Sequence, residues 1–140
     1  MRALSVSVTS LGREPARLPD LLARGPVVLD GAMGTKLDAR GVDTRSALWS
    51  ALALTTVPDV VCEVHSDYLD AGARVITNNT YQATLPALIR SGKDAAGARD
   101  TIAAGVRLAK AAAWAAKEAV VVAVGINCVA PGVVGRALPM

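Results

Sequence analysis

The sequence predicts an α/β fold in which parallel strands alternate with helices, with about three βα units in the chain. Three short apolar runs each lead into a polar loop, and the segments between them place apolar residues at helical spacing. The last run is wholly apolar, as expected when helices cover both faces of a parallel sheet. With 140 residues, of which 52% are hydrophobic, the chain is long enough for one domain with a buried core.

Folding is expected to begin near Leu18, so that residues 18–140 form the α/β domain. Residues 1–17 mix Ser, Thr, Gly, Arg and Pro without a period, and we interpret them as a loose N-terminal extension.

The first βα unit is expected to start with a strand at residues 26–29. This apolar run ends at Asp30 and Gly31, as a strand followed by a turn does. A brief helix is then expected around residues 35–40, with Gly41 at its C-terminal end.

A helix from Pro58 to Gly72 is expected before the second strand. Proline suits the first turn of a helix and glycine suits its end, and apolar residues recur between them at helical spacing. Residues 73–77 then predict a strand that is β-branched at its centre and runs into the polar loop 78–82.

A long Ala-rich stretch predicts a further helix over residues 94–117, and the apolar run 119–124 predicts a third strand that leads to Asn127 and Cys128. Each of the three strands therefore ends in a polar or reactive loop. Because the carboxyl ends of the strands form the active face of α/β folds, the three loops indicate one site.

Charge and cysteine content exclude several classes of partner. The net charge is +3, but Lys and Arg are scattered singly, so no nucleic-acid surface is expected. No stretch approaches the ~20 apolar residues of a membrane span, and the N-terminus has no apolar signal-peptide core, so we expect no membrane association. Two cysteines provide no disulfide framework, and a cytoplasmic protein is therefore expected.

The loops also carry the motifs of a known family. These motifs are LDGAMGTKLDARGVD from Leu29, LWS at 48–50, EVHSDYLDAGARVITNNTYQAT from Glu63, and VGINCVAP from Val124. In this order they resemble the homocysteine S-methyltransferase family, which includes betaine- and S-methylmethionine-dependent enzymes and the homocysteine-binding module of cobalamin-dependent methionine synthase. The resemblance covers residues 27–131.

The resemblance implies a partial (β/α)8 TIM barrel that binds zinc through three cysteines at the carboxyl ends of its strands. It also implies the reaction, in which zinc holds the homocysteine sulfur as a thiolate that attacks the methyl group of a donor, giving methionine. The donor is S-methylmethionine, S-adenosylmethionine or betaine. A metal serves this chemistry because a free thiol, with a pKa near ~8.5, is mostly protonated at neutral pH.

The same motifs imply residues for substrate binding. Asp30 and Gly31 correspond to contacts with the amino-acid part of homocysteine, where a carboxylate accepts hydrogen bonds from the α-amino group. Thr80 and Tyr81 lie in the loop that lines the pocket. Trp49 is expected near the donor, because an aromatic face attracts a methylated cation.

For the metal, Cys128 corresponds to the first zinc ligand and Asn127 to its neighbour on the wall of the site. The family's other two ligands form an adjacent Cys pair that this sequence does not contain, and Cys62 falls within a helix. We therefore expect a truncated and internally deleted relative, with the join between Gly105 and Gly125. The open edges of its short sheet favour oligomerisation.

The residues alone leave alternatives open. Asp30 also suits the cap of a turn, Trp49 a core anchor and Cys128 a small buried hydrophobe, while His65 and Tyr68 are expected to be packing and surface groups. For the whole chain, the alternative to an active methyltransferase is an inactive remnant or interaction protein of the same family. A nucleotide-binding domain is disfavoured because the glycines after the first strand lack the GxGxxG spacing.

Overall fold

The computed structural model describes residues 18–116. Its helices are, in order, α1 (Leu18–Leu22), α2 (Met33–Asp38), the 3-10 helix η1 (Trp49–Leu52), α3 (Ala53–Thr56), α4 (Pro58–Asp70), α5 (Leu85–Arg90) and α6 (Ala95–Ala115). In this part of the chain, no helix is long and apolar enough to cross a membrane.

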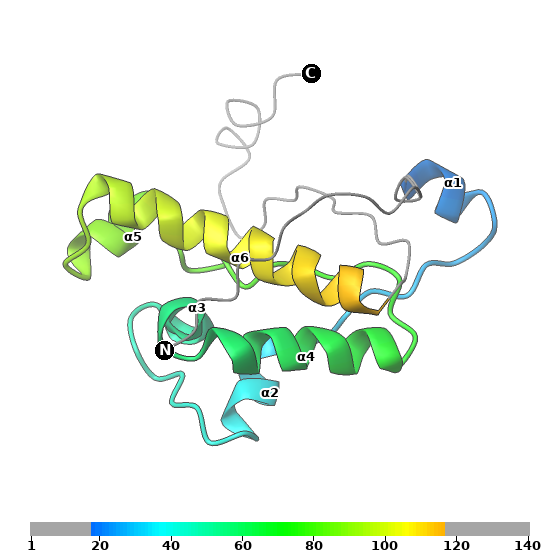
Figure 1. Cartoon of the computed structure of the whole chain (residues 1–140), viewed down its shortest axis with the longest axis horizontal. Helices are drawn as coiled ribbons and strands as arrows, with labels where there is room; N and C mark the ends of the chain where they lie inside the picture. Colours follow the sequence, from blue (N-terminus) through cyan, green and yellow to red (C-terminus); the bar gives the residue numbers. More distant parts are fainter. Residues whose placement is uncertain (1–17, 117–140) are drawn as a thin grey trace.

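The two longest helices, α4 and α6, lie side by side and run in the same direction (Figure 1). Near its start, α6 packs Ala98 into the same apolar cluster as Val61 of α4, and near its end Ala112 packs with Leu69. Two helices that follow successive parallel strands on one face of a sheet have this arrangement. The order of the packing therefore agrees with two consecutive βα units.

Local signals explain the limits of α4. Pro58 lies in its first turn, where a missing N–H costs nothing. At the other end the chain turns at Gly72, whose φ of +98° is favourable only for glycine, and the N–H of Ala73 bonds to the carbonyl of Tyr68 at 2.9 Å. The predicted helix is confirmed with nearly the predicted limits.

Helix α6 begins at a side-chain cap. The carboxylate of Asp94 accepts the backbone N–H of Gly97 at 2.7 Å, which satisfies one of the free donors of the first turn. Its buried face carries mostly small residues, which let the helix approach its neighbours closely: Ala98, Thr101, Gly105, Ala109, Ala112 and Ala113. The predicted helix over 94–117 is confirmed over nearly its whole length.

The two predicted strands in the described range are reduced to extended segments. Leu29 and Val75 form a single parallel bridge, and no longer strand forms among residues 18–116. Within residues 18–116 these two segments pair only with each other, and a two-stranded pair is marginal as a sheet. Val28 and Leu29 are each 59% exposed. The expected direction and pairing are correct, but the expected regular strands are wrong for this part of the chain.

Three further segments differ from expectation. Helix α2 begins two residues earlier than the predicted 35–40, and it ends before Gly41, which has a φ of +76°. Helix α5 was not predicted, although Thr84 caps it by accepting the N–H of Ala87 at 3.3 Å. The predicted extension 1–17 and the third strand 119–124 lie outside the described residues.

Candidate functional site

Asp30 and Thr77 join the ends of the two extended segments. The backbone N–H of Thr77 donates to Asp30 Oδ2 at 2.8 Å, and its hydroxyl donates to the same carboxylate, with distances of 3.0 Å to Oδ1 and 3.1 Å to Oδ2. The preceding rung runs from the N–H of Asp30 to the carbonyl of Val75 at 2.9 Å. In a regular parallel ladder the next rung would join the N–H of Thr77 to the backbone carbonyl of Asp30. The carboxylate replaces that carbonyl, and it is thereby held at the end of both segments.

Ser50 and Asn79 form a second connection at this end. The Ser50 hydroxyl donates to Asn79 Oδ1 at 2.6 Å, and Asn79 Nδ2 donates to the Ser50 carbonyl at 2.5 Å. Asn79 is only 3% exposed, so these bonds satisfy an amide that would otherwise be costly to bury. The connection ties the loop that carries the LWS motif to the loop after the second extended segment.

Two aromatic residues next to this connection are exposed. Trp49, directly before Ser50, is 61% exposed, and Tyr81, two residues after Asn79, is 50% exposed. Trp49 also has a φ of +48°, a left-handed backbone conformation that is rare for a large side chain. The core-anchor interpretation of Trp49 is therefore wrong, because its indole is mainly in solvent.

Two glycines allow close approaches around the site. A Cβ on Gly31 would lie 2.9 Å from the hydroxyl oxygen of Tyr68, which donates to the carbonyl of Ala32 at 3.2 Å. A Cβ on Gly105 of α6 would lie 2.6 Å from Cγ2 of Thr80. The loops that begin at Gly31 and Asn78 thus rest directly on helices α4 and α6.

His65 lies on the buried face of α4 and is completely buried. Neither of its ring nitrogens has a hydrogen-bond partner. Burial lowers the pKa of His65 below its ordinary value, while the nearby negative charge of Asp30 opposes this effect. The expected packing role agrees with this position, and the imidazole is neutral at physiological pH.

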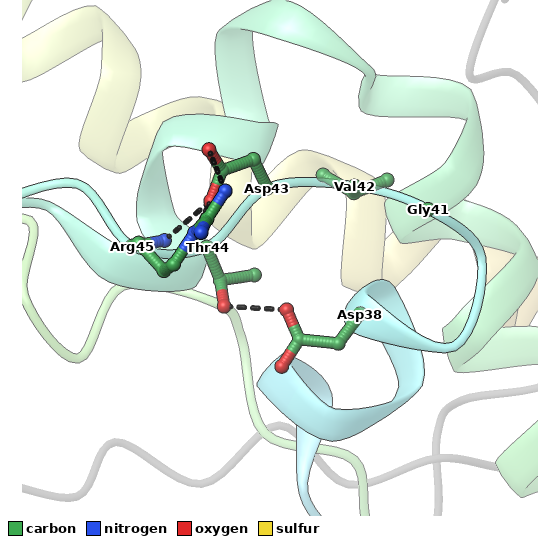
Figure 2. Close-up of a pocket in the computed structure, with 6 residues that line it drawn as sticks. All are labelled: Asp38, Gly41, Val42, Asp43, Thr44 and Arg45. Atoms are coloured by element: carbon green, nitrogen blue, oxygen red, sulfur yellow. Dashed lines mark hydrogen bonds and ion pairs between the residues drawn. The ribbon is translucent and has the colours of Figure 1, made fainter.

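Two hollows of the described surface do not coincide with these loops. Figure 2 shows the larger, of about 350 Å³, where Arg45 bonds to Asp43 and lowers the pKa of that carboxyl to about 2. It is lined by Asp38, Gly41, Val42, Asp43, Thr44 and Arg45. The second, of about 240 Å³, lies at the opposite ends of the extended segments, near Pro26 and Arg74. Active sites of parallel α/β folds lie at the carboxyl ends instead, which disfavours the second hollow. Neither hollow is lined by a residue expected to bind substrate.

Residues 18–116 contain no group of three or more His, Cys, Asp or Glu side chains placed to hold a metal ion. Cys62, on α4, is partly buried, and burial raises the pKa of its thiol, with the charges of Asp59 and Glu63 adding to the effect. A raised pKa disfavours the thiolate that zinc requires. Cys62 is therefore unsuited to replace a missing zinc ligand, as the sequence indicated.

The structure joins the ends of the two extended segments, which lead into Asp30 and Gly31 and into Thr80 and Tyr81. The bonds between Ser50 and Asn79 tie the turn that carries Trp49 to the second of these loops. Asn127 and Cys128 lie outside the described residues. Sequence reasoning did not identify Thr77 and Ser50 as parts of the site. Two signals in the sequence could have identified them: Thr77 ends the apolar run 73–77, and Ser50 belongs to the LWS motif.

Comparison with known proteins identifies the family. The model of the homocysteine S-methyltransferase family matches residues 27–126. Over 97 residues the chain is 47% identical to homocysteine S-methyltransferase 1 of Zea mays, which covers 68% of this chain and 30% of that protein. It is 42% identical over 86 residues to homocysteine S-methyltransferase of Escherichia coli K12. This match covers 61% of the present chain and 28% of the Escherichia coli protein. The chain belongs to the homocysteine S-methyltransferase family.

Solved structures agree with this assignment. The metallated form of the homocysteine methyltransferase MmuM from Escherichia coli matches with a TM-score of 0.64 at 41% identity, covering 68% of this chain and 33% of that one. Its oxidized form gives a TM-score of 0.66 at 40% identity. The chain thus spans about a third of the length of these relatives.

Proposed function

We propose that this chain forms the substrate-binding part of a homocysteine S-methyltransferase, in which Asp30 binds the α-amino group of homocysteine. The observation that carries this proposal is the carboxylate of Asp30, fixed by Thr77 at the ends of both extended segments. Membership of the family and the DGAMG motif around Asp30 support the same role.

The hydrogen bonds of Asp30 leave room for a ligand. A carboxylate offers about four acceptor positions. The N–H and the hydroxyl of Thr77 supply two hydrogens, so about two positions remain. An α-ammonium group has three N–H donors and the opposite charge, and charge-assisted hydrogen bonds of this kind are the strong ones.

The methyl donor is proposed to bind beside Trp49 and Tyr81. S-methylmethionine, S-adenosylmethionine and betaine all carry their methyl group on a positively charged sulfur or nitrogen. Exposed aromatic faces attract such cations through their π electrons. Trp49 is 61% exposed, which leaves its indole accessible to a small molecule.

In the proposed reaction the homocysteine sulfur attacks the methyl carbon of the donor. A new S–C bond forms as the bond from the methyl carbon to the donor atom breaks, and the thiol proton is released. The described residues do not fit the zinc that the family resemblance implies, and the sequence has two cysteines rather than three. Cys128 remains proposed as one ligand, and we assign no step to a metal held by this chain.

The cysteine content of the sequence, with two cysteines and no adjacent Cys pair, is the basis of a second candidate function. In that case the chain is an inactive remnant or interaction protein that retains the substrate-binding loops. Both candidates predict homocysteine binding, but only the first predicts turnover.

Calorimetric titration of the full chain with homocysteine tests the shared part of both proposals. We expect saturable binding that Asp30→Asn weakens. Methyl transfer from each of the three donors, with and without added zinc, then separates the candidates. Turnover that disappears in Cys128→Ser supports the enzyme, and binding without turnover supports the second candidate. Absence of homocysteine binding at millimolar concentration would contradict both.

A further inference from the structure

Trp49 combines an unfavourable backbone with a side chain that gains little from packing. Its φ of +48° brings the Cβ close to the following carbonyl, a conformation that L-residues other than Asn and Asp rarely adopt. Its indole is 61% exposed, so burial does not compensate for this cost. Backbone strain of this kind persists only where neighbouring structure imposes it, and it is concentrated at functional sites.

The residues on both sides of Trp49 are held in place. Before it, Leu48 is buried, and the N–H of Trp49 donates to the carbonyl of Ser46 at 2.9 Å. After it, Ala51 is 1% exposed and its N–H bonds to the carbonyl of Leu48 at 3.0 Å. Hydrogen-bonded turns therefore restrict the backbone on both sides of Trp49.

Ser50 and Asn79 connect this turn to the loop that follows the second extended segment. Their bonds of 2.6 and 2.5 Å engage both the side chain and the carbonyl of Ser50. These bonds fix the Ser50 side chain and the peptide unit between Ser50 and Ala51, which restricts the backbone directly after Trp49. Asn79 itself is buried, so the anchor is rigid.

We propose that Ser50 and Asn79 are positioning residues, whose paired hydrogen bonds hold Trp49 in its left-handed conformation and fix its indole beside the strand-end loops. The role of that indole in donor binding rests on the proposed function above, whereas the positioning itself does not. Thus the pair presets one wall of the donor pocket before any donor binds, which reduces the ordering cost of binding.

The mobility of Trp49 tests the positioning. The chain has two tryptophans, and Trp114 is exposed on α6, so Trp114→Phe leaves Trp49 as the single fluorophore. In this background, Asn79→Ala and Ser50→Ala are expected to increase the amplitude of fast indole motion in time-resolved anisotropy by at least twofold. Ser50→Thr keeps a hydroxyl and is expected to restore the slow decay. Unchanged anisotropy in folded Asn79→Ala and Ser50→Ala proteins would overturn the proposal.

The strain is tested independently if Asn79→Ala does not fold. At an ordinary right-handed position, glycine is less stable than alanine. We expect the reverse order here, with Trp49→Gly at least as stable as Trp49→Ala in urea unfolding, because only glycine adopts a positive φ without cost. A lower urea midpoint for Trp49→Gly than for Trp49→Ala would contradict the strained conformation.

Titration with S-methylmethionine and betaine separates this inference from the proposed function. If both hold, each donor that binds quenches Trp49 fluorescence, and Ser50→Ala weakens the apparent affinity about tenfold while Ser50→Thr does not. Increased mobility in Ser50→Ala without quenching by any donor would support the positioning role and contradict the donor site. Equal quenching and equal affinity in Ser50→Ala and its parent would support the donor site and contradict the positioning role.

Discussion

The carboxylate of Asp30 accepts the backbone N–H of Thr77 at 2.8 Å, in the place where a parallel ladder would use the backbone carbonyl of Asp30. This substitution ends the pairing of the two extended segments and fixes a negative charge at their carboxyl ends. The two alternatives for Asp30, a structural cap and a substrate contact, are therefore compatible, because one carboxylate has enough acceptor positions for both.

Neutralising Asp30 is expected to reduce homocysteine affinity much more than stability. Asn retains an oxygen that can accept the Thr77 N–H, but it loses the charge that attracts an α-ammonium group. A hydrogen bond to a charged partner contributes about 1.5–3 kcal/mol, so Asp30→Asn should weaken binding about 10- to 100-fold in calorimetry. The matched control is Asp70→Asn, at the exposed end of α4, which should bind as the parent does. Equal losses in both variants would show that overall charge, and not Asp30, governs binding.

Substitution of Gly105 is expected to disturb the loop at Thr80. The added Cβ of Gly105→Ala would lie 2.6 Å from Thr80 Cγ2, so helix or loop must shift. We expect a loss of about 1–3 kcal/mol in the free energy of unfolding, measured with urea, despite the better helix propensity of alanine.

Two further variants serve as controls for that contact. Thr80→Ser removes Cγ2 and should restore most of the stability lost in Gly105→Ala. Gly34→Ala, on α2, adds a Cβ with nothing within 4 Å and should leave the protein equally stable or slightly more stable. A destabilised Gly105→Ala protein without rescue by Thr80→Ser would assign the clash to another neighbour.

Stability is expected to fall as the pH drops below about 6.5, the ordinary pKa of histidine. Burial lowers the pKa of His65, so between 6.5 and that lowered value the unfolded chain binds a proton that the folded chain does not. The slope from one such group reaches at most about 1.4 kcal/mol per pH unit. His65 is the only histidine, so its NMR titration is unambiguous.

Two variants check the cause of that pH dependence. His65→Phe removes the titrating group and should abolish this part of the slope in urea unfolding between pH 6.5 and 5. Asp30→Asn removes a charge that favours the imidazolium, so the pKa of His65 should fall further. An NMR pKa at or above 6.5 in the parent protein would refute the buried, neutral state.

The cap of α6 is expected to be worth about 1 kcal/mol. Asp94→Ala removes the acceptor of the Gly97 N–H, whereas Asp94→Ser keeps one. Urea unfolding should therefore show a loss for alanine that serine largely avoids. Asp100→Ala, an exposed change inside the same helix, controls for the lost charge and should have little effect.

Helices α4 and α6 were predictable from the sequence because their signals are local. Pro58, Gly72 and Asp94 act on backbone groups within a few residues, and the apolar spacing defines which face is buried. The parallel pairing of the two extended segments was predictable from the alternation of strands and helices. Regular strands were predicted wrongly because strand length depends on neighbouring partners rather than on the run itself. The third strand, Cys128 and a cytoplasmic location remain predictions.

The sequence by itself determined the family, through motifs whose order and spacing are visible in one dimension, and the faces of the main helices. The tertiary structure alone decided which side chains cooperate. The contact of Asp30 with Thr77 spans 47 residues and that of Ser50 with Asn79 spans 29. Neither contact follows from periodicity or composition. Each exists because segments far apart in the sequence pack against each other, and packing of this kind also buries His65 on α4.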